Sequence, residues 1–156
     1  MQETSSWPQD FEQCVQFHGH ICPGLSIGYR AAKAALDHLA AQRSEDEELV
    51  AIVETDACGV DAVQVLTGCT FGKGNFVYKD RGKQAFTFIS RQSGSGIRLV
   101  MRPDGFAPEP RHQELMGRVV QGQASPEEER EFQQAHHTAS ERVLDMPLDQ
   151  LFQIQT

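Results

Sequence analysis

The sequence lacks the features that define several classes of protein. No apolar run approaches the ~18 residues of a membrane span, and residues 1–10 have no basic patch followed by an apolar stretch that would indicate a signal peptide. Basic residues are also scarce, since 14 Lys and Arg stand against 22 Asp and Glu, for a formal net charge of -8. Phosphate backbones and anionic membrane surfaces bind basic proteins, so nucleic-acid and membrane partners are not expected. These absences predict a soluble, cytoplasmic protein.

The cysteines lack the paired spacing of common zinc and redox motifs. The chain has four of them, Cys14, Cys22, Cys58 and Cys69, and no CxxC pair. This pattern disfavours a zinc ribbon and a thioredoxin-like couple. In a reducing compartment the four remain thiols that bind metal, react or pack in the core. With 156 residues and no internal repeat, the chain is long enough for one domain with a sizeable core.

The first motif that carries chemistry is residues 17–24, FHGHICPG. It brings His18, His20 and Cys22 within five positions, and its glycines and proline allow a tight turn in which the three side chains converge. Imidazole and thiolate donors at this spacing indicate a transition-metal site. The alternative is that each histidine caps or bonds to a neighbour, while the cysteine packs as a small apolar residue.

A second cysteine motif follows residues 49–55, which have the composition of a strand buried on both faces. Asp56 is suited to cap the next helix, which would place Cys58 in the first turn, where backbone N–H groups and the helix dipole lower a thiol pKa. A thiolate there can act as a metal ligand or as a nucleophile. Asp61 and Gln64 are neighbours on this apolar helix, so both side chains need polar partners.

The third motif is the glycine-rich segment GCTFGKGN, residues 68–75. Three glycines allow its backbone to approach a ligand closely, and the hydroxyl, amine and amide of Thr70, Lys73 and Asn75 suit an anion or another polar group. The glycine spacing and the missing GKS/T ending exclude a Walker loop. The alternative is a plain glycine-rich connection before a strand.

Patterning and turn residues outline the rest of the chain. Helices are expected at 11–17, 24–43, 56–68, 109–121 and 125–144, and strands at 49–55, 75–79, 84–91 and 97–102. A capping box opens the last helix. The last three strands predict an antiparallel meander, with a turn at residues 80–82 joining the first two. The apolar tail at 146–154 is expected to dock on the body or on another copy of the chain.

These elements predict an α+β fold, with a mixed or antiparallel sheet packed against helices and followed by C-terminal helices. They divide into a core that carries the site, residues 1–104, and a helical extension, residues 105–156, without a zinc ribbon. In the extension, His136 and His137 point about 100° apart on one helix, which favours surface or interface positions over shared metal binding. His112 has no ligand spacing and is left without a role.

Two stretches, FHGHICPGLSIGYR and VETDACGVDAVQVLTGCTFGKGNFVYKDRGKQAF, together resemble the FmdE-like family of formylmethanofuran dehydrogenase proteins. The similarity covers roughly residues 11–101, and the tail segment MPLDQLF also looks similar. The resemblance implies an α+β core, a homodimer and a place in anaerobic metabolism. It also implies association with the molybdenum or tungsten oxidoreductase that converts CO2 to formylmethanofuran. Members often carry a C-terminal zinc ribbon, but no cysteine follows Cys69 here.

Carried over position by position, the resemblance covers the polar residues of all three motifs. These are His18, His20, Cys22, Cys58, Asp61, Gln64, Cys69, Thr70, Lys73 and Asn75. We expect the metal to be zinc, although nickel or iron would suit the same donors.

We assign the metal ligands to the two histidines with Cys22 and Cys58, and keep Cys69 as a weaker candidate. Catalytic roles fall to Cys58, Asp61 and Lys73, with Asp61 orienting a histidine or acting as a base. We assign substrate binding to Gln64, Thr70 and Asn75.

Three functional hypotheses follow. The first is a metal-dependent site that acts on a small one-carbon or anionic substrate. The second is a non-catalytic accessory protein, or a carrier of a metal or cofactor, for a molybdenum or tungsten oxidoreductase. The third is metal-free thiol chemistry with Cys58 as nucleophile. The first two require the histidine-rich turn and the start of the Cys58 helix to meet in space, and a separation above about 10 Å would exclude a shared ion.

Overall fold

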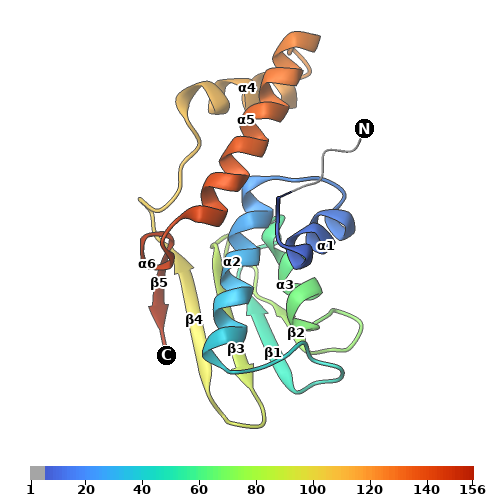
Figure 1. Cartoon of the computed structure of the whole chain (residues 1–156), viewed down its shortest axis with the longest axis vertical. Coiled ribbons are helices and arrows are strands. Elements are labelled where there is room, and N and C mark those ends of the chain that lie inside the picture. Colours follow the sequence, from blue (N-terminus) through green and yellow to red (C-terminus); the bar gives the residue numbers. More distant parts are fainter. Residues whose placement is uncertain (1–5) are drawn as a thin grey trace.

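The computed structural model describes residues 6–156. The expectation that residues 1–10 form no signal peptide falls partly on residues 1–5, which lie outside the described part. Figure 1 shows a sheet covered on one face by helices, with a helical hairpin that leaves this body and a C-terminal segment that returns to it. In chain order the elements are α1 (Gln9–His18), α2 (Pro23–His38), β1 (Leu49–Val53), α3 (Gly59–Thr67), β2 (Phe76–Tyr78), β3 (Ala85–Ser90), β4 (Gly96–Met101), α4 (Pro110–Val120), α5 (Pro126–Asp145), α6 (Leu148–Leu151) and β5 (Phe152–Gln155).

The five strands form one mixed sheet in the order β2-β1-β3-β4-β5, which confirms the α+β prediction. The pair β1 and β2 is parallel, and the other neighbours are antiparallel. The predicted hairpin between residues 75–79 and 84–91 is wrong, because β1 lies between these two strands. The backbone explains this arrangement. The segment after β2 bonds to the end of β1 from both sides, with Lys79 N–H donating to Val53 O at 2.8 Å and Lys83 N–H to Glu54 O at 2.9 Å.

The core lies between the sheet and the helices α2 and α3, which cross one face of it (Figure 1). Its largest fully buried side chains include Phe86, Phe88 and Leu99 from the sheet and Leu25 from α2. Burial along β1 alternates between buried and half-buried residues, so the expectation of a strand buried on both faces was wrong. Only one face of the sheet meets the helical layer, and alternation is the pattern that such a sheet produces.

Three glycines set how closely α2 and α3 approach. A Cβ atom built on Gly28 would lie 2.0 Å from the carbonyl oxygen of Gly59, and one on Gly59 would lie 2.8 Å from the carbonyl oxygen of Gly24. These contacts are with backbone atoms, which have no rotamer through which to move away. The beginnings of the two helices can therefore meet only because side chains are missing at this crossing.

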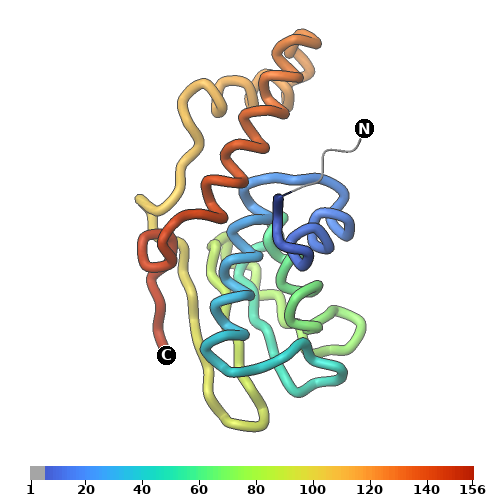
Figure 2. Tube along the Cα trace, in the orientation of Figure 1, coloured from blue at the N-terminus to red at the C-terminus, as the bar shows by residue number. Residues whose placement is uncertain are grey.

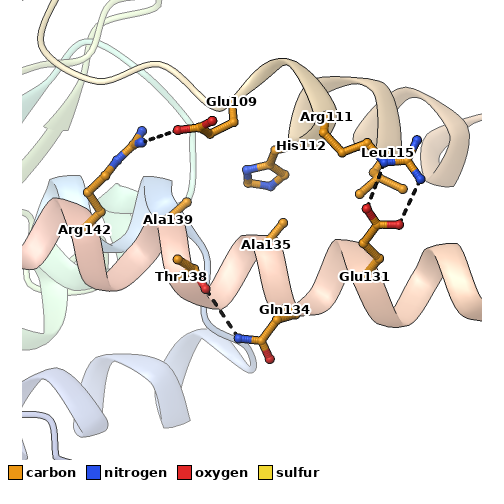
Figure 3. Close-up of a pocket in the computed structure, with 10 residues that line it drawn as sticks. All are labelled: Glu109, Arg111, His112, Leu115, Glu131, Gln134, Ala135, Thr138, Ala139 and Arg142. Carbon is orange, nitrogen blue, oxygen red and sulfur yellow. Dashed lines mark hydrogen bonds and ion pairs between the residues drawn. The ribbon is translucent and has the colours of Figure 1, made fainter.

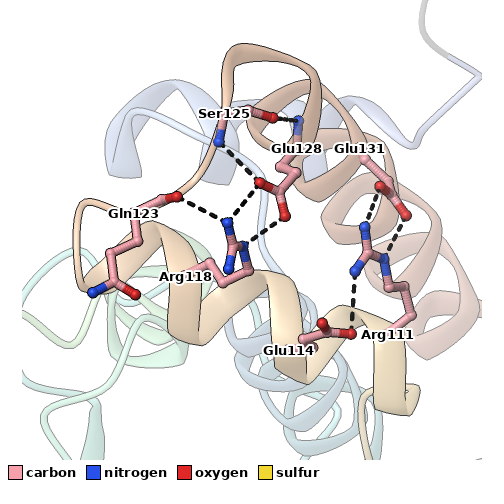
Figure 4. Close-up of polar contacts among 7 residues, drawn as sticks. All are labelled: Arg111, Glu114, Arg118, Gln123, Ser125, Glu128 and Glu131. Carbon is pink, nitrogen blue, oxygen red and sulfur yellow. Dashed lines mark hydrogen bonds and ion pairs between the residues drawn. The ribbon is translucent and has the colours of Figure 1, made fainter.

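The C-terminal third forms an extended hairpin of α4 and α5, followed by a return to the sheet (Figure 2). The predicted capping box is present, with Ser125 accepting from the Glu128 N–H and the Glu128 carboxylate accepting from the Ser125 N–H. Arg118 joins this corner through an ion pair with Glu128, and Arg111 forms a two-pronged pair with Glu131 (Figure 4).

The C-terminal end of α5 is hydrogen-bonded to α2. The Arg30 guanidinium on α2 donates to the carbonyl oxygens of Val143, Leu144 and Met146, at 2.9, 2.9 and 2.6 Å. The tail then adds β5 to the edge of the sheet, with Phe152 opposite Met101, so the predicted docking occurs on the body of the chain itself. Within residues 6–156, none of the helices combines the length and hydrophobicity needed to traverse a bilayer.

The glycine crossing gives a test of what holds the site together. We expect Gly28→Ala to lower the free energy of unfolding by about 3 kcal/mol or more, because the new methyl group collides with backbone. Gly117→Ala on α4 is the matched control, since a Cβ atom there meets nothing within 4 Å, and it should be neutral or raise that free energy by up to about 1 kcal/mol. Urea unfolding of both variants in chelator, followed by circular dichroism, measures the difference. Equal stability of the two variants would show that the crossing tolerates a side chain.

Candidate metal centre

The histidine-rich turn is built from the end of one helix and the beginning of the next. His18 is the last residue of α1, and Gly19 follows in the left-handed region at φ 102, with its N–H bonded to Val15 O. The chain then extends through Cys22, the N-cap of α2 at φ -155, into Pro23 in the first turn. Since a left-handed residue reverses the chain, the rings of His18 and His20 lie side by side, with centroids 4.4 Å apart.

The fourth side chain comes from the start of α3. The structure places Cys58 at the N-cap, whereas the sequence predicted that Asp56 would be the cap, so α3 begins two residues later than expected. The Cβ position of Gly24 lies 3.4 Å from the Cys58 Cβ, which puts this thiol directly over the first turn of α2. The glycine crossing thus determines that the N-caps of α2 and α3, both cysteines, face each other.

Four donor residues converge at this point: His18, His20, Cys22 and Cys58. One ligand atom from each lies within 4.8 Å of all the others, and Cys22 Sγ is 3.9 Å from His18 Nε2. The predicted meeting of the turn and the Cys58 helix is confirmed. Bonds to zinc are about 2.0–2.3 Å long, which separates tetrahedral ligand atoms by roughly 3.3–3.8 Å, so these donors fit an ion after a slight contraction. Two nitrogens and two sulfurs form a typical zinc ligand set.

Asp61 orients the most buried histidine of the cluster. Its Oδ2 lies 2.6 Å from His18 Nδ1, which leaves Nε2 directed toward the thiols. Burial alone would lower the pKa of His18, but the Asp61 hydrogen bond and the neighbouring Cys58 together raise it. A carboxylate on the far nitrogen fixes the ring and makes the near nitrogen a better donor, which is the usual support of a metal-bound histidine.

The two cysteines behave as a pair in which one thiol gives up its proton easily. A hydrogen bond from the Cys22 thiol lowers the pKa of Cys58 to about 5, against the opposing effect of burial, with His18 and His20 adding to the shift. The same hydrogen bond, followed by burial, raises the pKa of Cys22. The site is therefore prepared as a thiolate at Cys58 in neutral solution, and binding a cation would remove the second proton.

A cavity of about 320 Å³ lies beside the cluster. It is lined by His18, Thr55, Asp56, Ala57, Cys58, Val60, Asp61, Phe71, Phe76 and Tyr78. Two of the four donor residues and the carboxylate that orients His18 therefore form part of its wall. An ion at the cluster would sit at the edge of a space large enough for a small molecule.

The polar residues of the third motif make hydrogen bonds within the protein. The Asn75 side chain is fully buried, where it accepts from Thr70 N–H and donates to the carbonyl oxygens of Asp46 and Leu49. The Lys73 ammonium donates to Ser44 O at 2.9 Å. These groups tie the glycine-rich loop to residues 44–49.

Gln64 makes a related contact, since its Oε1 accepts from Phe71 N–H at 3.4 Å. Gln64, Thr70, Lys73 and Asn75 are absent from the cavity wall, so their catalytic and substrate-binding roles stay predictions. Cys14 and Cys69 are fully buried and do not belong to the donor group.

The sequence reasoning missed the aromatic wall and a second cavity. Phe71, Phe76 and Tyr78 frame the first cavity, and their only sequence signal is the spacing of aromatic residues around Lys73 and Asn75. None of the three was assigned a role.

The second cavity, of about 370 Å³, lies between α4 and α5 (Figure 3). There the buried His112 shares a hydrogen bond of 2.6 Å with the half-buried His136. Burial lowers the pKa of both, which favours neutral rings. Across residues 6–156, one group of three or more donors could hold a metal ion, and it consists of His18, His20, Cys22 and Cys58. The pair of His112 and His136 does not form a second group of this kind.

Removal of Asp61 tests its orienting role. We expect Asp61→Ala to weaken zinc binding by about 10- to 100-fold, because His18 loses the partner that fixes its ring. In the metal-free variant the pKa of His18 should fall, because the hydrogen bond that raises it is gone. Competition with a chromophoric chelator measures the affinity, and histidine NMR signals measure the pKa. Asp104→Ala, an exposed carboxylate after β4, is the control. Unchanged affinity in Asp61→Ala would assign Asp61 to another role.

Alkylation tests the thiol pair. In metal-free protein the rate of iodoacetamide reaction at Cys58 should be half-maximal near pH 5 and level above it, because the thiolate is the reacting form. Cys22 should react much more slowly at neutral pH, because its pKa is raised. Peptide mass spectrometry follows each site separately. A half-maximal rate for Cys58 near the free-cysteine value of about 8.5 would refute the pairing.

Comparison with known proteins agrees with this architecture. The model of the family described as FmdE, molybdenum formylmethanofuran dehydrogenase operon, matches residues 17–153. A probable S-adenosyl-L-methionine-binding protein of Archaeoglobus fulgidus is 40% identical over 93 residues, which are 57% of this chain and 25% of that protein. This chain therefore spans about a quarter of the length of that curated relative.

A solved structure gives a further comparison. It is that of a tungsten formylmethanofuran dehydrogenase FmdE-like protein from Syntrophus aciditrophicus, with 26% identity and a TM-score of 0.57. The alignment covers 92% of this chain and 67% of the other. Because the family model spans both cysteine motifs, most of the sheet and the whole α4–α5 hairpin, the chain belongs to the FmdE family.

Proposed function

We propose that this protein binds one transition-metal ion, most favourably zinc, and uses the centre to act on a small molecule held in the adjacent cavity. The observation that carries the proposal is the convergence of four donor atoms within 4.8 Å at the edge of a cavity of about 320 Å³. Neither feature would be informative alone. Together they support a metal site with room beside it for a small molecule.

The donor chemistry supports zinc and allows nickel or iron. Imidazole nitrogen and thiolate sulfur are borderline and soft ligands, and the set has no oxygen donor of the kind that calcium or magnesium requires. When bound, such an ion supplies Lewis acidity and activates water or a carbonyl group. Asp61 orients His18 through Nδ1, and the cavity wall holds the substrate beside Cys58.

His20 is the ligand most suited to exchange. It is exposed and lies on the turn after Gly19, whereas Cys22 is buried at the start of α2. Three anchored donors, His18, Cys22 and Cys58, would keep the ion while His20 gives way to substrate. Three protein ligands with an open position is the arrangement of catalytic zinc.

A second candidate function is that of a carrier or accessory protein. The observation in its favour is that four protein donors are enough to complete a tetrahedral sphere, as in structural and storage sites. In this case the protein would be a cytoplasmic homodimer that docks on a molybdenum or tungsten oxidoreductase. The projecting hairpin of α4 and α5 would offer the contact surface.

Elemental analysis of protein purified without an affinity tag tests the metal proposal. Wild type should contain close to one transition-metal ion per chain, and Cys22→Ser and Cys58→Ser should each lose most of it, because serine is a poor ligand for zinc. Cys69→Ser is the matched control and should retain the metal, since Cys69 lies outside the donor group. A folded wild type without metal, or full retention in both ligand variants, would contradict the proposal.

X-ray absorption on the zinc-loaded protein separates the two functions. A sphere of two sulfur and two nitrogen neighbours that survives addition of excess small ligands supports the carrier. Replacement of one nitrogen by another atom on ligand addition supports catalysis. The variant His20→Ala should keep its zinc in the catalytic case, with solvent in place of the missing imidazole.

A further inference from the structure

The wall of the cavity beside the metal centre has an unusual chemical composition for a site that was expected to bind an anion. Its lining includes three aromatic rings, Phe71, Phe76 and Tyr78, and two carboxylates, Asp56 and Asp61. Across the described part of the chain, no lysine or arginine belongs to the wall. An anion entering this space would find no lysine or arginine to pair with, and the Nδ1 atom of His18 is already bonded to Asp61.

Three basic residues of the core, Lys73, Arg81 and Arg98, are engaged in other contacts. The Lys73 ammonium bonds to backbone carbonyl oxygens of the loop at residues 44–45. Arg81, in the loop after β2, pairs with the buried Glu54 at 3.2 Å. Arg98 pairs with the second oxygen of Glu54 at 2.6 Å. Both arginines are therefore paired with Glu54, and Glu54 is not part of the cavity wall.

A bound ion would not reverse the sign of the site. A divalent cation held by two thiolates and two neutral imidazoles has a net charge of zero, since each thiolate carries one negative charge. The carboxylates of Asp56 and Asp61 then leave the surroundings negative. Asp80 contributes a further negative charge next to the wall residue Tyr78, because its carboxylate accepts from the Tyr78 hydroxyl at 3.1 Å.

The aromatic rings are available to a ligand. Phe71 is 84% exposed and Tyr78 is 45% exposed, which is unusual for large rings that lie next to a cavity. Aromatic faces combined with carboxylates are the recognition chemistry of organic cations, in which the negative face of each ring attracts an alkylated ammonium or similar group. A purely apolar ligand would gain from the rings but nothing from the carboxylates.

We propose that the cavity binds a small organic cation with an alkylated positive centre, seated among Phe71, Phe76 and Tyr78 and facing Asp56. This inference rests on the proposed function for the presence of an ion beside the cavity, and it replaces the one-carbon or anionic substrate expected from the sequence. The positive centre lies against the rings, and the remainder of the ligand extends toward Cys58 and the metal. The ligand class is thus set by residues that the metal-binding motifs do not contain.

Three probes of the same shape and different charge test the proposal: choline, 3,3-dimethyl-1-butanol and 3,3-dimethylbutanoate. Binding to the full chain is measured by saturation-transfer NMR and calorimetry, with zinc and again with chelator. We expect choline to bind about fivefold or more tighter than the neutral alcohol, and the carboxylate to bind weakest. Tightest binding of the carboxylate, equal affinities, or no binding of any probe at millimolar concentration would overturn the proposal.

Variants locate the effect in the wall. Asp56→Asn should lower the affinity for choline and leave the affinity for the uncharged alcohol unchanged. Phe76→Leu should reduce the preference for choline over the alcohol. Asp104→Asn makes the same change of charge on an exposed residue away from the wall, and all three probes should bind it as they bind wild type. Weaker choline binding in Asp104→Asn, or unchanged choline binding in Asp56→Asn, would contradict the proposed location of the cation site.

Metal content is measured in every sample, which separates this proposal from the metal centre. A wild type that prefers choline but contains no metal would refute the metal function alone. A wild type that contains zinc but prefers the carboxylate would refute the cation site alone. The chelated samples give the same comparison without an ion, since removing zinc leaves the wall residues in place.

Discussion

The close approach of α2 and α3 is the constraint on which the candidate site depends. Gly28 and Gly59 let backbone contact backbone at distances that no side chain would permit. Each helix begins at this crossing with a cysteine at its N-cap. Because the N-terminal end of a helix carries partial positive charge, two helix starts aimed at one point favour a thiolate there, and Cys58 is the one that ionises while the Cys22 thiol keeps its proton. The packing of the core thus brings the two sulfur atoms together, and the hydrogen bond between them lowers the pKa of Cys58 and raises that of Cys22.

The histidines depend on a different local feature. Gly19 ends α1 in a left-handed conformation and turns the chain back over the start of α2, so that the imidazoles reach the same point as the thiols. The buried ring is fixed by Asp61 from α3, and the outer ring is exposed. The cluster therefore combines three donors held by secondary structure with one held by a turn. An ion bound there would be firmly retained on one side and accessible on the other.

The sequence predicted the donor group well because its members are locally encoded. The pattern HGHICPG fixes three donors through a turn of known chemistry, and Cys58 follows a strand and opens a helix. The sequence failed where partners are remote. β2 pairs with β1 across more than 20 residues rather than with the next strand, and His112 meets His136 over a separation of 24. The hydrogen bonds that the buried Asn75 amide makes to the loop were also not predicted, and its substrate-binding role stays a prediction. Single-sequence patterns do not show which backbone atoms require such a side chain.

The hairpin of α4 and α5 is connected to the centre through α2. Its exposed ion pairs, such as Arg111 with Glu131, contribute little to stability in water, since solvent screens them. What holds it in place is α5 packed along α2 and the cap that Arg30 forms on the last carbonyl groups of α5. Arg30 lies two turns along the helix that begins at Cys22. The hairpin is therefore anchored both to the helix that carries Cys22 and, through α6 and β5, to the edge of the sheet.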